Sequence, residues 1–264
     1  MAEIQNVIQA LLQSVEPLKD TVDTVKSGEI GREVTGIAVT FMATYEVIER
    51  AAKAGANLII THEPTFFNHL DETDWLELDE VYQAKRRLIE DTGVTIFRFH
   101  DYCHRHVPDF ILAGLLKALG WEKYANKTQP TAPLLVNIPT ASLSEVVNHV
   151  KQSLGIPFVR VVGNDSLLCS KVGLFSGYGG VGRRTIPFAG QENLDLIIAG
   201  EGPEWETPEY VRDAVQAGFR KAFILLGHQK SEEAGMEYVA DYLKPLFPDV
   251  PVMFFGTEPA LRAM

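Results

Sequence analysis

The sequence of 264 residues has little cysteine, no surplus of positive charge and no long hydrophobic run. Its two cysteines, Cys103 and Cys169, are too few for a disulfide framework and are typical of a reducing compartment, so we expect a cytoplasmic location. Lys and Arg number 24 against 35 Asp and Glu, a formal net charge of −11, which argues against binding to a nucleic-acid backbone. No stretch approaches the roughly 20 apolar residues that cross a bilayer, so no membrane partner is expected.

The first 20 residues also lack the basic stretch and continuous apolar core of a targeting signal. Their apolar residues instead recur at helical spacing between Ile4 and Val15, which predicts an amphipathic helix packed on the body of the protein. Hydrophobic residues make up 46% of the chain and charged residues 22%, as in folded globular proteins. The length allows one large or two small domains.

Short apolar or β-branched segments alternate with amphipathic ones along the chain. Strands are predicted over residues 34–40, 57–61, 94–99, 134–138, 158–162, 171–175, 194–199 and 221–226, and helices over 44–54, 81–91, 110–119, 143–154, 208–217 and 233–246. This alternation predicts an α/β protein in which right-handed crossovers join parallel strands.

A polar, proline-containing segment at residues 126–133 is the best candidate for a domain boundary. The pattern of strands and helices restarts after it. We therefore expect two small α/β lobes, the first formed by residues 1–127 and 227–264 and the second by residues 128–226, with a metal site in the cleft between them.

Side chains that bind metals are concentrated in three segments, each directly after a predicted strand. The segments are Thr61–Pro64, His100–His106 and Gly227–Glu233, and they contain five of the seven histidines. If the three strands are parallel neighbours, these side chains converge at the edge where open α/β sheets bind ligands. Imidazole and carboxylate groups bind Zn²⁺, Mn²⁺ or Fe²⁺, and several of them together permit a dinuclear centre. The three segments predict a metal site.

Two of these segments resemble a known family. Residues 56–67, Ala-Asn-Leu-Ile-Ile-Thr-His-Glu-Pro-Thr-Phe-Phe, are similar to a family segment in which an aliphatic strand runs into Thr/Ser-His-His-Pro-Leu-Phe-Phe. Residues 227–233, Gly-His-Gln-Lys-Ser-Glu-Glu, resemble a Gly-His-Tyr-x-Ser-Glu segment. Both belong to the GTP cyclohydrolase I type 2 family of Nif-three-like dinuclear-metal proteins. The resemblance extends from about Val34 to the C-terminus.

The chain departs from the family at two positions. Glu63 stands where the family has a second histidine, and His104 stands at the position of a ligand aspartate. The resemblance implies two divalent ions, Zn, Fe, Mn or similar, held by three imidazoles and two carboxylates: His62, Glu63, His104, His228 and Glu232. The register of the second segment leaves an alternative in which Asp101 supplies the carboxylate, with His100 or His106 nearby.

Other polar features have two interpretations each. Residues 177–182 fit the pattern G-x-G-x-x-G, but residues 183–187 do not predict the helix that a dinucleotide-binding loop requires. The resemblance places this loop toward the metal site, where its amides with Arg183 and Arg184 could contact an anionic substrate; the alternative is a tight turn with a solvated arginine pair. Glu201 is either an acid behind the metal ligands or an exposed loop carboxylate. We expect His69 and His149 on the surface.

These features favour a metal-dependent hydrolase that acts on a small substrate, for which an anionic nucleotide is one candidate. The resemblance implies GTP ring opening as the activity and a toroidal homohexamer as the assembly. The alternative is a non-enzymatic protein that binds or delivers metal, or an oligomeric scaffold with structural ions. A catalytic ion keeps an open coordination position, and five ligands shared by two ions leave positions open.

Overall fold

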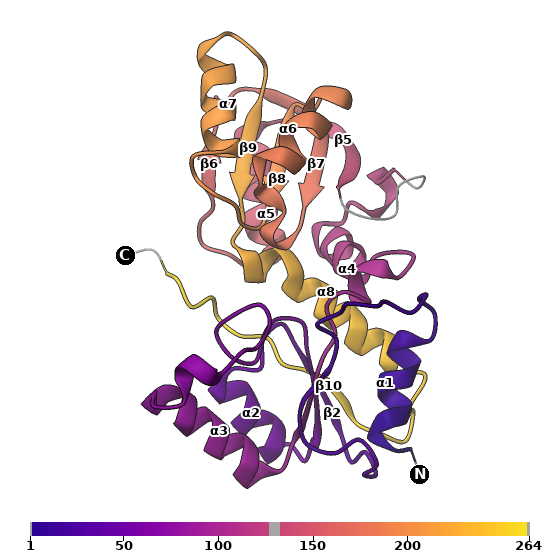
Figure 1. Cartoon of the computed structure of the whole chain (residues 1–264). Coiled ribbons are helices and arrows are strands. Elements are labelled where there is room, and N and C mark those ends of the chain that lie inside the picture. Colours follow the sequence, from indigo (N-terminus) through magenta and orange to yellow (C-terminus); the bar gives the residue numbers. More distant parts are fainter. Residues whose placement is uncertain (1, 127–132, 263–264) are drawn as a thin grey trace. The chain divides into compact units, whose positions relative to one another are not determined.

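The computed structural model describes residues 2–126 and 133–262. They form two compact units: unit 1 comprises Met1–His106 and Met236–Glu258, and unit 2 comprises Val107–Gly235 and Pro259–Met264. The expected boundary at residues 126–133 falls mainly on residues 127–132, which lie outside the described residues. Each unit contains one five-stranded sheet with helices packed against it (Figure 1), which confirms the predicted α/β class.

The sheet of unit 1 has the strand order β1-β4-β3-β2-β10. Its strands are β1 (Val25–Ser27), β2 (Ile37–Thr40), β3 (Leu58–Thr61), β4 (Thr95–Arg98) and β10 (Val252–Phe254). β10, β2, β3 and β4 are parallel, whereas β1 pairs with β4 in the antiparallel direction. The three central strands are buried along their whole length, which explains their continuous apolar sequences.

The helices of unit 1 cover both faces of this sheet: α2 (Tyr45–Lys53) and α3 (Glu80–Thr92) lie on one side and α1 (Ile4–Leu12) on the other (Figure 1). The Thr44 hydroxyl accepts from the backbone of Val47 and caps α2, and the Asp79 carboxylate caps α3 in the same way. Two 3₁₀ turns, Asp74–Leu76 (η1) and Cys103–Arg105 (η2), follow β3 and β4. The crossovers therefore leave the loops after β3 and β4 at the same edge of the sheet.

The sheet of unit 2 has the order β5-β7-β8-β9-β6. Its strands are β5 (Leu134–Ser142), β6 (Arg160–Val162), β7 (Leu168–Phe175), β8 (Leu196–Ala199) and β9 (Ala222–Leu225). β7, β8 and β9 are parallel and buried in the middle, and antiparallel β5 and β6 form the edges.

Helices also cover both faces of the sheet of unit 2. Side chains of α4 (Phe110–Leu119) and α5 (Leu143–Leu154) share one apolar core with it, and side chains of α6 (Gly182–Gln191) and α7 (Thr207–Gln216) share the other. Short 3₁₀ turns lie at Glu122–Tyr124 (η3) and Gly177–Gly180 (η4).

The last helix, α8 (His228–Leu243), starts five residues before the predicted start at residue 233. Gly227, with φ of 94°, makes the sharp turn from β9 directly into the helix. The predicted apolar stripe on this helix, Met236, Val239, Ala240 and Leu243, is fully buried. At its start, α8 lies so close to α4 that a Cβ atom on Gly114 would lie 2.2 Å from the carbonyl oxygen of Ala234.

The prediction that residues 183–187 do not form a helix is wrong, because they lie in α6. Pro187 lies inside this helix, and a proline there argues against a helix on propensity alone. The short strands β1 and β10 were not predicted. Among the helices of the described residues, none is long and apolar enough to span a membrane.

Candidate metal centre

The loops after β3 and β4 bring three predicted histidines together in unit 1. Thr61 pairs with Arg98 in the parallel register of the two strands, so His62 and His100 leave the sheet side by side. His104 follows in the 3₁₀ turn η2, four residues after His100. Because β3 and β4 are parallel neighbours, the first two predicted segments meet at one edge of the sheet.

The three imidazole rings face one another. The His62 and His100 rings stack with their centroids 4.6 Å apart, and the His104 ring lies 5.1 Å from the first and 5.3 Å from the second. One ring nitrogen of each histidine lies within 4.8 Å of the other two. His62 is buried, and His100 and His104 are half-buried. Such a set of nitrogen ligands suits a divalent transition metal.

Neighbouring groups orient two of these rings. Nδ1 of His62 donates to the carbonyl oxygen of Phe99 at 3.1 Å, and Nδ1 of His100 lies 2.9 Å from the Asp101 carboxylate. A ring that donates through Nδ1 presents the lone pair of Nε2, which is how proteins prepare histidine ligands for metals. Burial, together with the neighbouring His62, lowers the pKa of His100 to about 4, so its ring is neutral at pH 7.

Asp101 orients His100 through its contact with Nδ1 of the ring. Its carboxylate accepts from the Thr21 hydroxyl at 2.9 Å and from the Val22 backbone at 3.1 Å. Partial burial alone would raise the pKa of Asp101, but the hydrogen bonds from His100, Val22 and Thr21 outweigh it and lower the pKa. Asp101 thus holds His100 and the preceding loop together as an ionised acceptor.

Asp23 fixes the turn that carries His100. Its carboxylate accepts the backbone N–H groups of His100, Asp101 and Tyr102 at 2.8–2.9 Å. Burial raises the pKa of Asp23, and these hydrogen bonds oppose the rise. Nothing in the local sequence marks this role, because the donors lie 77 to 79 residues away.

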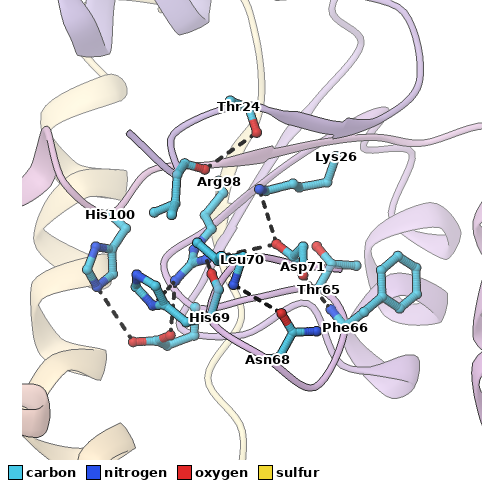
Figure 2. Close-up of polar contacts among 12 residues, drawn as sticks. Thr24, Lys26, Thr65, Phe66, Asn68, His69, Leu70, Asp71, Arg98 and His100 are labelled. Atoms are coloured by element: carbon cyan, nitrogen blue, oxygen red, sulfur yellow. Dashed lines mark hydrogen bonds and ion pairs between the residues drawn. The ribbon is translucent and has the colours of Figure 1, made fainter. Parts of the chain in front are cut away.

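Arg98 connects the two ligand loops from inside the protein (Figure 2). Its side chain is fully buried, and its Nη2 lies 3.4 Å from Oε2 of Glu63. Its Nε donates to the carbonyl oxygen of His62 at 3.1 Å, and its Nη1 donates to the carbonyl oxygen of His69. Asp71 lies 3.9 Å from the same guanidinium and 3.2 Å from Lys26 (Figure 2).

Arg98 was not among the predicted site residues, although its position in the sequence marks it. An arginine inside an otherwise apolar strand is stable in a buried position only when acidic or carbonyl groups interact with its guanidinium. Burial lowers the pKa of Arg98, and Glu63 and Asp71 oppose this effect. The second oxygen of Glu63 lies 3.9 Å from Nε2 of His100, so this carboxylate stands between Arg98 and the imidazoles.

The third predicted segment belongs to unit 2, because it follows β9 of the other sheet. His228 and Glu232 lie one turn apart at the start of α8, with Nε2 of His228 3.2 Å from Oε2 of Glu232. Nδ1 of His228 lies 2.8 Å from Oε2 of Glu201, which orients the ring as Asp101 orients His100.

The remaining candidates have other contacts. Nε2 of His106 lies 2.8 Å from the carbonyl oxygen of Leu11, so this histidine anchors α1 instead of joining the other imidazoles. His69 and His149 are exposed, as expected, although the His69 ring lies 5.6 Å from that of His100. Cys103 is a buried thiol.

The glycine-rich turn precedes a helix after all, but a carboxylate already occupies the start of that helix. The backbone N–H of Gly182 donates to Oε2 of Glu206 at 2.6 Å, in the place where a dinucleotide loop would bind phosphate. This contact argues against a dinucleotide. Arg183 and Arg184, in the first turn of α6, are exposed.

Comparison with known proteins gives the chain a family context. A family model described as Duf34/NIF3 (NGG1p interacting factor 3) matches residues 3–260. A Clostridium perfringens protein named "GTP cyclohydrolase 1 type 2 homolog" is 24% identical over 249 residues, 90% of each chain. A Chlamydia muridarum protein of the same name is 23% identical over 88% of this chain and 87% of its own length.

Solved structures share the fold. A hypothetical protein of Staphylococcus aureus superposes with a TM-score of 0.74 at 16% identity and covers 99% of both chains. A Bacillus cereus protein described as related to NIF3 gives a TM-score of 0.73 at 16% identity, covering 98% of this chain and 97% of that one.

Proposed function

The chain belongs to the Duf34/NIF3 family, and from that premise we propose that it binds divalent metal ions and hydrolyses a small anionic substrate. One observation carries the proposal: His62, His100 and His104 converge at a sheet edge with ligand nitrogens within 4.8 Å of one another. The names of the relatives, which include GTP cyclohydrolase 1 type 2, support a nucleotide as one candidate substrate.

The finer form of the proposal comes from the resemblance of the sequence. The resemblance assigns two ions, Zn, Fe, Mn or similar, to His62, Glu63, His104, His228 and Glu232, and it adds a toroidal homohexamer. The small number of cysteines adds a cytoplasmic location to the proposal. When bound, such ions act as Lewis acids and lower the pKa of water enough to supply a nucleophile near neutral pH.

The residues of the chain contribute orientation and charge to this chemistry. Phe99 and Asp101 fix the rings of His62 and His100, and Glu201 fixes that of His228. In the proposed function, the exposed guanidinium groups of Arg183 and Arg184 attract the anionic substrate, which the net charge of −11 otherwise repels.

Elemental analysis and a hydrolysis screen test the proposal together. The full chain, purified without chelator and reconstituted with Zn²⁺ or Mn²⁺, is assayed against GTP, other nucleotides and phosphoesters. We expect one to two bound ions per chain and turnover that is lost in His62→Asn, a variant that keeps a donor for the Phe99 carbonyl. The control His149→Asn changes a surface histidine and should keep full turnover.

The outcomes separate the two function classes. Metal binding without turnover of any substrate supports the metal carrier or scaffold over the hydrolase. Binding of less than about one ion per chain after reconstitution contradicts metal binding and hydrolysis alike.

A further inference from the structure

Unit 1 has a pocket of about 360 Å³ whose walls are β1, the loop after β3 and helix α3. Its lining residues belong to positions 25–27, 66–73 and 82–90, which include none of the predicted metal ligands. The volume is at the lower end of the range of about 300–1,000 Å³ that is typical of small-molecule pockets. The pocket is therefore a candidate site for a small ligand outside the proposed metal centre.

An ion pair in this pocket presents both signs of charge side by side. Nζ of Lys26 lies 3.2 Å from Oδ2 of Asp71 (Figure 2), and the two side chains are only 11% and 6% exposed. Oδ1 of Asp71 accepts from the backbone N–H of Phe66 at 2.7 Å, but Oδ2 accepts no hydrogen bond from the described residues. Arg98, at 3.9 Å from Oδ2, is too distant for one.

Both partners of this ion pair can still bind a ligand. A buried carboxylate oxygen normally accepts a hydrogen bond, so Oδ2 of Asp71 is open to a donor that enters the pocket. The ammonium of Lys26 has three donors, so it can bind an acceptor on a ligand while it stays paired with Asp71. The pocket therefore suits a ligand with one donor group and one acceptor group close together.

Aromatic and aliphatic side chains line the pocket beside this ion pair. The rings of Phe66 and Tyr82 pack edge to face with their centroids 5.0 Å apart, and Ile89 follows Tyr82 two turns later on α3. Apolar side chains around a few fixed polar groups are usual in ligand pockets. An apolar group on the ligand would be stabilised here by burial.

The charged groups that line the pocket cancel one another. Lys26 and Asp71 form one ion pair, and Arg86 and Glu90, 2.8 Å apart and more than half exposed, form the other. Such a lining gives neither an anion nor a cation a net attraction. The pocket thus favours a ligand whose own charges also cancel, unlike the anionic substrate of the proposed hydrolysis.

We propose that this pocket binds a free amino acid with an apolar side chain. The ammonium and carboxylate groups of an amino acid are attached to the same carbon, so its opposite charges lie side by side, as those of Lys26 and Asp71 do. The ammonium donates to Oδ2 of Asp71, and the carboxylate accepts from Lys26. The apolar side chain of the ligand then packs against the rings of Phe66 and Tyr82.

Isothermal titration calorimetry of the full chain, metal-free and with a chelator present, tests this proposal. Metal is left out because amino acids themselves bind transition metals through nitrogen and oxygen. The ligands are leucine, isocaproate, which lacks the ammonium, and isoamylamine, which lacks the carboxylate. We expect leucine to bind with a Kd below about 1 mM, and each analogue to bind more than about 10-fold more weakly because it loses one charge-assisted hydrogen bond.

Two variants test whether leucine binds in this pocket. Lys26→Met and Asp71→Asn each remove one charge, and each should weaken leucine binding by more than about 10-fold. Asn at position 71 keeps an acceptor for the N–H of Phe66 and tolerates the φ of 58° found there. The matched control Lys53→Met changes an exposed lysine that pairs with Glu49 on α2, and it should bind leucine as the unaltered chain does.

Each contrary result overturns the proposal or one part of it. Absence of binding of leucine, valine and phenylalanine at about 10 mM overturns the proposal as a whole. Equal affinity for leucine and for one analogue contradicts the pairing of both charges. If Lys26→Met and Asp71→Asn keep both the far-UV circular dichroism and the affinity of the unaltered chain, the ligand binds elsewhere.

A measurement on the unaltered chain covers the case in which a variant does not fold. Leucine should shift the methyl NMR signals of Val25 and Ile89, which line the pocket, and unchanged signals at saturating leucine overturn the assignment. All of these results are obtained without metal, so they do not depend on whether the proposed function is right.

Discussion

Replacement of Arg98 by methionine should destabilise the protein far more than replacement of an exposed arginine. The variant leaves Glu63, only 10% exposed, and Asp71, only 6% exposed, without the guanidinium that faces them. It also removes donors to the backbone carbonyls of His62 and His69. Breaking a buried ion pair by removing one partner costs about 3–5 kcal/mol. We therefore expect a loss of about 4 kcal/mol, or about 8–16 °C in Tm at this chain length.

Thermal unfolding at pH 7 measures the effect, with Arg86→Met as the matched control. Arg86 is 54% exposed and pairs with Glu90 one helical turn away, so its loss should cost no more than about 0.5 kcal/mol. The double variant Arg98→Met/Glu63→Gln also removes one of the two buried carboxylates left without the guanidinium, and it should recover about half of the lost stability. A Tm for Arg98→Met within about 2 °C of that of Arg86→Met would refute the reasoning.

Two further predictions concern other parts of the chain. Gly114→Ala places a Cβ atom 2.2 Å from the carbonyl oxygen of Ala234 and should lower the free energy of unfolding in urea by about 1–3 kcal/mol. The control Gly190→Ala, with no described atom within 4 Å, should be neutral or stabilising. Equal effects of the two variants would contradict the close approach of α4 and α8. Burial lowers the pKa of Lys85 to about 8 from 10.5, so the unfolded chain binds more protons between these values and stability rises with pH there. Relative to Lys85→Met, the free energy of unfolding of the unaltered chain should rise by about 2 kcal/mol between pH 7 and pH 10. If the difference in this free energy between the two chains stays constant over that range, Lys85 is not buried as a cation.

The alternation of strands and helices was predictable because each central strand is buried on both faces and each helix on one. Continuous apolar segments such as 58–61 and 222–225 therefore stand out in the sequence. The edge strands β1 and β10 carry no such signal, because each has three residues and depends on a partner strand far away in sequence. Helix α6 escaped prediction because its interior proline contradicts local propensity.

The candidate site was predictable as far as strand ends determine it. His62, His100 and His104 follow neighbouring parallel strands, and the pattern alone identified them as metal-binding candidates. The sequence did not decide whether His104 or Asp101 is the ligand of the second segment, because that choice depends on the direction of the side chains. The structure brings His100 and His104 together with His62 and turns Asp101 toward Thr21. Asp23 was not identified, because its hydrogen-bond donors lie 77 to 79 residues away. Arg98 was missed although a charged residue inside an apolar strand marked it.

The discontinuous chain path of unit 1 has a consequence for how the protein is made. Most of unit 2 is inserted between His106 and Met236, and β10, which pairs with β2 at the sheet edge, is contributed by residues 252–254. On the ribosome, most of unit 2 therefore emerges before the sheet of unit 1 can be completed. Because domains fold as units during synthesis, we expect unit 2 to reach its folded state first, while the nascent segment bearing His62 and His100 stays exposed to chaperones and to cellular metal.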